Sequence, residues 1–115
     1  MEGGGPMIIA PHAIIRYLER IEGFDVEGAR QRLRPAALRT IGDAALVALL
    51  EQEEPALIAR VSETMMRACA DAAGSGAVSL VSAGVKYVFR GRAIVTVMRP
   101  GARIKKRKRE RETIA

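Results

Sequence analysis

The sequence predicts an α+β fold, in which N-terminal helices pack on a small C-terminal antiparallel sheet of three to four strands. Apolar residues recur with the helical period of 3.6 as far as about residue 73 and with strand-like spacing beyond residue 76. Residues 90–93 also place Gly91 at the first central position of a two-residue loop, as a type II′ hairpin requires. A chain of 115 residues has the size of one domain. We expect that domain over residues 1–101, followed by a basic C-terminal arm over residues 102–115.

The first predicted helix follows a glycine-rich lead and the short apolar run 7–10, which is either a strand or a covering segment. Pro11 suits the first helical position, since the amide it lacks has no partner there. Gly23 ends the helix just after Glu22. The apolar stripe consists of Ile14, Tyr17, Leu18 and Ile21.

Two short helices are expected next. Asp25 can cap a helix that Pro35 ends, and its buried positions are Val26, Ala29 and Leu33. Asp43 can cap a third helix over residues 44–52. The apolar surface of this third helix is wider than one stripe and comprises Leu46, Val47, Leu49 and Leu50.

The fourth helix is expected from Pro55 to about Ala73, with Cys69 on its apolar side. Strands are predicted at 78–81, 85–90 and 93–98. The two-residue loop fixes which residues of the last two strands face each other. The pairs expected on one face are Phe89 with Ile94, Tyr87 with Thr96, and Val85 with Met98.

Several classes of protein are excluded by composition. One His and one Cys are too few for an ordinary zinc site, and a single Cys forms no internal disulfide. No run approaches the roughly 18 apolar residues of a membrane span, and the first residues lack a basic region before an apolar core. A P-loop is also absent. We therefore expect a soluble cytoplasmic protein of bacterial type that uses no metal and no cofactor.

The charge is distributed unevenly along the chain. Residues 1–98 carry 11 basic and 11 acidic side chains, whereas residues 99–115 carry eight basic and two acidic ones. The segment 43–74 has six acids and two bases, and residues 75–109 have ten bases and no acid. A polyanion is therefore expected to meet the C-terminal third.

A row of polar side chains on the first helix is the strongest candidate for chemistry. His12, Arg16 and Arg20 are spaced four residues apart, so they lie on one helical face. Histidine exchanges protons near neutral pH, and arginine binds phosphate oxygens through a planar set of donors. This combination suits cleavage of an RNA phosphodiester. The same spacing is also typical of an exposed Arg/Glu surface without function.

The predicted hairpin adds further candidates. Tyr87 and Thr96 would stand side by side, either as partners of the reacting hydroxyl or as an ordinary cross-strand pair. Arg90 and Arg92 flank the turn and could bind phosphate. Five consecutive cations in the arm are typical of nucleic-acid binding: Lys105, Lys106, Arg107, Lys108 and Arg109.

Two segments resemble a known group of proteins. HAIIRYLER, residues 12–20, resembles the His-Ala-x-x-Arg-x-x-x-Arg opening of small bacterial and phage proteins in the barnase, EndoU, colicin and RelE-like nuclease superfamily. KYVFRGRAIVTV, within residues 85–97, is similar to the closing hairpin of that group. The resemblance implies metal-independent cleavage of RNA, or of mRNA on the ribosome. It implies an acid/base role for His12, phosphate contacts for Arg16 and Arg20, and sheet-borne partner roles for Tyr87, Arg90 and Thr96.

The function expected from the sequence is therefore a ribonuclease-like module of toxin or phage type, with RNA or the ribosome as partner. A toxin of this kind would usually have a cognate inhibitor protein. Two alternatives remain open. One is a non-catalytic nucleic-acid- or ribosome-binding protein that uses the arm, and the other is a phage-type accessory or assembly protein whose acidic helices and basic tail join subunits.

Overall fold

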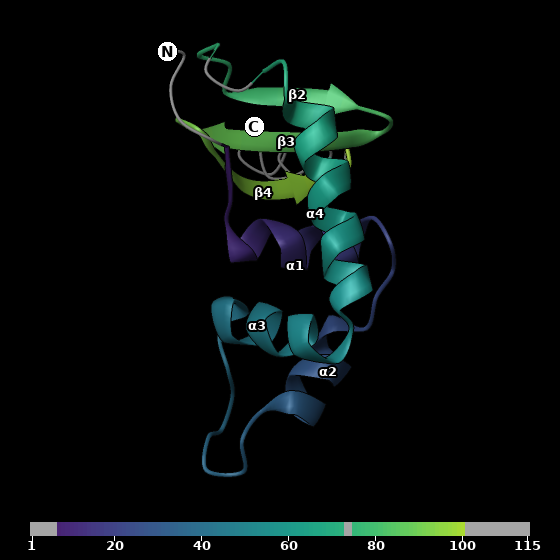
Figure 1. Cartoon of the computed structure of the whole chain (residues 1–115), viewed down its shortest axis with the longest axis vertical. Coiled ribbons are helices and arrows are strands. Elements are labelled where there is room, and N and C mark those ends of the chain that lie inside the picture. The colour runs from purple at the N-terminus through teal and green to yellow at the C-terminus, as the bar shows by residue number, and fades with distance from the viewer. Residues whose placement is uncertain (1–6, 73–74, 101–115) are drawn as a thin grey trace, which may run out of the picture.

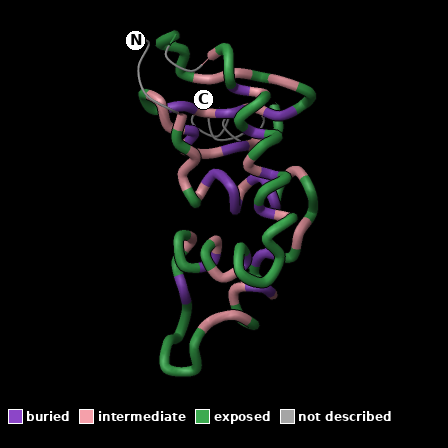
Figure 2. The backbone as a smooth tube through the Cα atoms, viewed as in Figure 1, coloured by how far each residue is buried: buried purple, intermediate pink, exposed green. Residues whose placement is uncertain are grey.

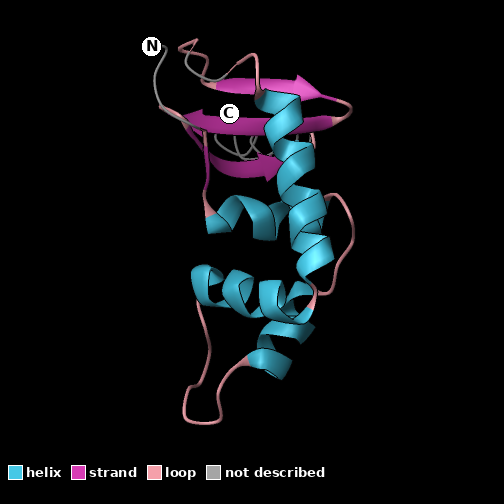
Figure 3. Ribbon diagram, viewed as in Figure 1, coloured by secondary structure: helices cyan, strands magenta, loops and turns pink. Residues whose placement is uncertain are grey.

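The computed structural model describes residues 7–72 and 75–100, and it has the expected α+β fold with helices before the main strands (Figures 1 and 3). The basic arm and the glycine-rich lead lie outside the described residues. The fourth helix ends at Cys69 and not near Ala73 as predicted, because residues 70–72 already form turns. The helices are α1 (Pro11–Arg20), α2 (Val26–Leu33), α3 (Asp43–Glu53) and α4 (Pro55–Cys69). The strands are β1 (Ile8–Ile9), β2 (Ser79–Ser82), β3 (Val85–Arg90) and β4 (Ala93–Met98).

The predicted helix starts are confirmed for three of the four helices. Pro11 and Pro55 are the first residues of α1 and α4, where a missing amide costs no hydrogen bond. The carboxylate of Asp25 accepts a hydrogen bond from the amide of Gly28 at 3.0 Å and caps α2. None of the helices in the described ranges offers an apolar stretch long enough to cross a membrane.

The start of α3 differs from the prediction. Gly42 occupies the N-cap position and Asp43 is the first helical residue, with no side-chain hydrogen bond capping the helix. The Asp43 carboxylate is instead engaged by residues of α1 and α2. The expected wide apolar surface of this helix is only partly buried, because Leu46 and Leu50 are enclosed while Val47 and Leu49 are half-buried.

Two tight hairpins build most of the sheet. Ala83 and Gly84 both have positive φ in the turn that joins β2 to β3, as a type I′ turn requires. In the turn that joins β3 to β4, Gly91 has a φ of 63°, so the predicted glycine-dependent turn is confirmed.

The predicted register of the β3–β4 hairpin is right near the turn and wrong beyond it. Phe89 pairs with Ile94, as expected, but a bulge at Val95 then shifts the pairing by one residue. Tyr87 therefore faces Val97, not Thr96. The bulge allows Ile94 and Val97 both to point toward the helices and be fully buried, which strict alternation along β4 would prevent.

The short N-terminal strand completes the sheet in the order β1-β4-β3-β2. It pairs in parallel with the start of β4, and the amide of Ala10 donates to the carbonyl of Ile94 at 3.0 Å. The sheet is therefore mixed, while its three longer strands are antiparallel. This pairing also fixes where α1 begins, because Pro11 follows directly.

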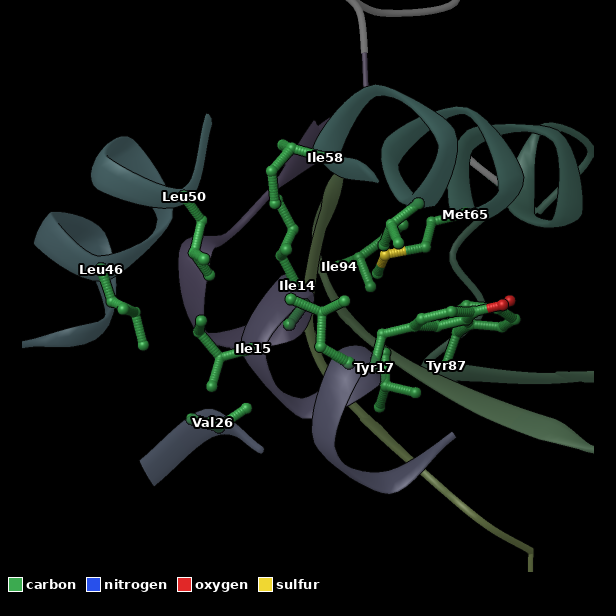
Figure 4. Packing of buried hydrophobic residues seen from close by; sticks show 14 of the residues in the cluster. Ile14, Ile15, Tyr17, Val26, Leu46, Leu50, Ile58, Met65, Tyr87 and Ile94 are labelled. Carbon is green, nitrogen blue, oxygen red and sulfur yellow. The ribbon is translucent and has the colours of Figure 1, made fainter. Parts of the chain in front are cut away.

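Helix α1 lies at the centre of the molecule, between the sheet and α3 (Figure 1). Its buried residues occupy more than one stripe because it packs against strand β4 on one side and against helices α3 and α4 on the others. Figure 2 shows buried segments in α1 and along the strands of the sheet. Figure 4 shows Tyr17 of α1 beside Tyr87 of β3, with Met65 of α4 close by. These contacts join the helical part to the sheet.

The opposite face of the sheet is more open. Lys86, Val88 and Thr96 are half-buried there, and Ile8 and Val81 are 59% and 57% exposed. Among residues 7–72 and 75–100, the sheet thus has one face packed against helices and one face that no helix covers.

Candidate functional site

The candidate site lies where the N-termini of α1 and α3 meet. Burial of Ala13 and Ile14 fixes the rotation of α1, and this rotation brings His12 and Arg16 to the side that faces α3. Asp43 lies at the beginning of α3, where a negative charge also interacts favourably with the helix dipole. Three helices contribute to the cluster, since Arg30 comes from α2.

Four side chains form a continuous row of polar contacts. The Nδ1 atom of His12 lies 2.7 Å from Oδ2 of Asp43, and Arg30 donates to the other oxygen of Asp43 at 3.1 Å. On the other side of the ring, Nε of Arg16 donates to Nε2 of His12 at 3.3 Å. The row therefore runs from Arg16 through His12 and Asp43 to Arg30.

The cluster is neither buried nor fully open. The His12 side chain is 43% exposed and that of Asp43 is 27% exposed, while Arg30 is the most enclosed member at 15%. Exposure thus decreases from the imidazole toward the guanidinium behind it. A ligand can therefore reach the His12 side chain more easily than Arg30. Arg30 lies behind Asp43 and contacts the carboxylate from the enclosed side of the cluster.

The charge of Asp43 is stabilised by its neighbours. Burial alone would raise the pKa of this carboxyl group, but the hydrogen bonds with His12 and Arg30 and the positive charge of Arg30 lower the pKa below its ordinary value. Asp43 is therefore an anion at neutral pH. An ionised carboxylate only accepts hydrogen bonds, so the imidazole must donate through Nδ1.

This hydrogen bond determines what His12 can do chemically. When Nδ1 carries the proton, a neutral imidazole presents a lone pair at Nε2. The Arg16 contact at Nε2 is consistent with that lone pair. A carboxylate behind one ring nitrogen and a lone pair on the other is the arrangement of an oriented general base, and Asp43 would stabilise the imidazolium that forms.

Arg16 has a second partner that limits its freedom. One of its terminal nitrogens donates to Oε1 of Glu19 at 2.6 Å. The guanidinium is therefore held beside His12, with about one third of the side chain exposed. From this position it could meet a phosphate oxygen at the imidazole.

Arg20, the third residue of the predicted row, is directed elsewhere. It donates to the backbone carbonyl of Val97 at 3.1 Å and so links the end of α1 to β4. Nearby, Arg99 donates to the carbonyl of Arg20 at 3.0 Å. In the described residues Arg20 thus joins helix and sheet and does not join the His12 cluster.

Tyr87 and Thr96 are separated by the sheet itself, so the prediction that they stand side by side is wrong. Tyr87 is only 2% exposed on the helix-facing side, where burial, followed by nearby Tyr17 and Cys69, raises its phenol pKa to about 12. Thr96 is opposite Val88 on the other face. The physical cause is the bulge at Val95, which shifts the register by one residue and so exchanges the faces.

Cys69 is buried beside the same aromatic residues, as its apolar helical face predicts. Burial raises its thiol pKa to about 11, so the thiolate that nucleophilic chemistry needs is scarce at neutral pH. Within residues 7–72 and 75–100 no group of three or more His, Cys, Asp or Glu side chains is arranged to hold a metal ion.

The predicted nucleic-acid contacts divide into two groups. Arg90 is exposed and Arg92 half-buried at the β3–β4 turn. Lys86, which the sequence analysis did not single out, is a further cation on the open face of β3. Lys105, Lys106, Arg107, Lys108 and Arg109 lie outside the described residues.

Two members of the cluster were missed by sequence reasoning. Asp43 was interpreted as a helix cap, because an acidic residue before an apolar run fits that role equally well. Arg30 carried a more specific signal, since it lies four residues after Val26 and three before Leu33, on the predicted apolar stripe. A cation on a buried stripe requires a partner, and Asp43 is that partner.

Comparisons of the chain with protein-family models, with curated proteins and with solved structures found no significant match.

Proposed function

We propose that this chain is a metal-independent endoribonuclease-type module in which His12, oriented by Asp43, is the general base. The observation that supports this proposal is the 2.7 Å contact between Nδ1 of His12 and the Asp43 carboxylate, with Nε2 in contact with Arg16 and 43% of the His12 side chain exposed. General bases act best when their proton affinity lies near the working pH, and histidine meets that condition.

The reaction would proceed by attack within the RNA strand. Nε2 of His12 takes the proton of a ribose 2′-hydroxyl, and the 2′-oxygen forms a bond to the adjacent phosphorus. The bond from phosphorus to the 5′-oxygen breaks, and that oxygen receives a proton from the imidazolium or from water. The products are a 2′,3′-cyclic phosphate and a 5′-hydroxyl end.

Arg16 would stabilise the charge that builds up on the phosphate. Its guanidinium lies 3.3 Å from the base nitrogen, so it can exchange this contact for a phosphate oxygen when RNA binds. Arg20 and Tyr87 have no part in this mechanism, because the first is bonded to the Val97 carbonyl and the second is buried.

Cations of the C-terminal third would hold the RNA. Lys86 and Arg90 have no ion pair with another described residue, and the segment 75–109 contains ten bases and no acid. Such groups bind the phosphate backbone through charge and release of counterions, with little base selectivity. RNA, free or in the ribosome, is therefore the polyanion we assign to this surface.

The test uses the full chain and a mixed single-stranded RNA in the presence of EDTA. We expect fragments that carry 2′,3′-cyclic phosphate ends with the wild type and none with His12→Ala. Arg39→Ala is a matched control, because Arg39 is an exposed cation without a partner among the described residues. Equal cleavage by the wild type and His12→Ala would contradict the proposed role of His12.

A second candidate function is supported by the charge distribution alone. A non-catalytic RNA- or ribosome-binding protein would need the cations of residues 75–109 but not His12. Intact RNA with both proteins, together with a retained gel shift, would favour this function. Ribosomes programmed with mRNA would then be the remaining substrate to assay.

A further inference from the structure

We propose that Arg30 is a positioning residue that acts through Asp43 to hold the His12 imidazole in its Nδ1–H tautomer; this inference rests on the proposed function of His12 as a general base. Among the described interactions Arg30 contacts Asp43 and has no contact with the imidazole itself. Its effect on chemistry would be exerted entirely through the carboxylate.

The geometry shows how one guanidinium fixes the carboxylate. One terminal nitrogen of Arg30 donates to Oδ1 of Asp43 at 3.1 Å, and the other donates to the backbone carbonyl of Ile41 at 2.8 Å. These two acceptors lie on either side of Gly42, the N-cap of α3. Arg30 therefore fixes both the backbone that enters α3 and the orientation of the Asp43 side chain.

The two oxygens of Asp43 have separate tasks. Oδ1 is bound to Arg30 and Oδ2 is bound to His12 at 2.7 Å. With Arg30 in place, rotation of the carboxylate would break the contact with the guanidinium, so Oδ2 stays directed at Nδ1. Without Arg30 the carboxylate gains freedom to turn toward water, and the preference for a proton on Nδ1 weakens.

The charged side chains near Arg30 do not take over its contact with Asp43. Glu27 approaches Arg30 at 3.8 Å, but its side chain is 73% exposed. Exposed pairs of this kind contribute little. Arg32, on the same helix, pairs with Glu53 at 2.5 Å and has no contact with Asp43 among the described interactions. Arg32→Ala is thus a matched control that removes a cation from α2 without touching the cluster.

The chain offers a direct readout, because His12 is its only histidine. In the full chain labelled with ¹⁵N, the two ring-nitrogen shifts therefore belong to His12 without further assignment. For the neutral ring we expect a protonated Nδ1 and an unprotonated Nε2 in the wild type and in Arg32→Ala. Arg30→Ala should lower the ratio of the Nδ1–H to the Nε2–H tautomer by about fivefold, the effect of losing one ordinary hydrogen bond.

Cleavage kinetics give a second readout. Arg30→Ala should lower kcat with KM little changed, since Arg30 does not contact RNA in this role. Arg30→Lys should show smaller losses than Arg30→Ala, because a lysine can approach Asp43 but cannot donate to Asp43 and to the Ile41 carbonyl at once as the guanidinium does.

Several results would overturn the inference. A wild-type ring that carries its proton on Nε2 would contradict it directly and needs no variant. An unchanged tautomer ratio in Arg30→Ala would also contradict it. If that variant does not fold, Arg30→Gln removes the positive charge with less loss of side-chain volume, and an unchanged ratio together with an unchanged kcat in that variant would contradict the inference. Absence of cleavage by a wild type with the expected tautomer would instead contradict the proposed nuclease function alone.

Discussion

The helical and sheet parts of the molecule use charge in different ways. Residues 7–72 carry eight basic and ten acidic side chains, whereas residues 75–100 carry four basic side chains and no acid. In the helical part, ion pairs link separate elements: Arg32 with Glu53, Arg60 with Glu22, and Arg30 with Asp43. In the sheet part there is no carboxylate to pair with.

The charges of the helical part stabilise the fold through ion pairs, whereas the cations of the sheet part have no carboxylate within residues 75–100 to pair with. Strands are held by backbone hydrogen bonds and by the apolar core, so cations on the open face of the sheet are not needed for folding. The paired charges of the helices could bind a ligand only if their ion pairs were broken first. The proposed function accordingly assigns polyanion binding to the cations of residues 75–109 and acid/base chemistry to the helical cluster of His12, Asp43 and Arg30.

The largest expected effect concerns the junction between the two parts. Tyr87→Ala should lower the free energy of unfolding by about 3–5 kcal/mol, as expected for removal of a buried aromatic ring. Tyr87→Phe should keep both stability and cleavage, because the ring packs against the helices and its hydroxyl has no hydrogen-bond partner among the described residues. Urea unfolding checks both variants. Loss of cleavage in a stable Tyr87→Phe protein would restore a chemical role for Tyr87.

The next effect concerns the arm. Truncation after Gly101 should weaken binding of single-stranded RNA by about 100-fold at low salt and reduce the slope of log affinity against log salt by about 3, because five consecutive cations are removed. A salt titration of RNA affinity measures both quantities. Unchanged affinity would exclude the C-terminal arm as a binding surface.

A smaller effect is expected on the sheet itself. Lys86→Glu combined with Arg90→Glu should weaken RNA binding by about tenfold, since two unpaired cations become repulsive. Arg39→Glu, a single charge reversal in the helical part, is the control and should leave affinity nearly unchanged. Equal losses per reversed charge in the two proteins would mean that net charge alone, and not the sheet face, determines binding.

The smallest expected effect is a pH dependence of stability. The folded-state pKa of Asp43 is lowered, so its ionised form stabilises the fold above the unfolded-state value of about 3.9, and this contribution is lost as pH falls through the folded-state value. Asp43→Asn should therefore be less stable than the wild type by about 1 kcal/mol at neutral pH. The difference should narrow below pH about 4. Urea unfolding from pH 7 to pH 3 tests this, and a difference that does not vary with pH would contradict it.

The predictable features of the fold are those set by nearby residues. Pro11, Pro55 and Asp25 mark helix starts through local chemistry, and Gly91 marks the hairpin through its positive φ. The bulge at Val95 has no such local mark. It results from the burial of both Ile94 and Val97 against the helices, which is known only once those helices are placed.

The candidate site was predictable only in part for the same reason. His12 and Arg16 are neighbours on one helix, so their spacing predicts their contact. Asp43 lies 31 residues from His12 and reaches it through the packing of α1 on α3. An acidic residue at the start of a helix is compatible with a contact to His12, but this pattern does not predict the contact.

The most direct test of the division between chemistry and binding measures cleavage and RNA affinity on the same three proteins. These are the wild type, His12→Ala, and Lys86→Glu combined with Arg90→Glu. We expect His12→Ala to lose cleavage and keep its affinity, and the double charge reversal to lose affinity and keep kcat at saturating RNA. A His12→Ala protein that cleaves like the wild type, or two variants that lose both properties together, would contradict the account.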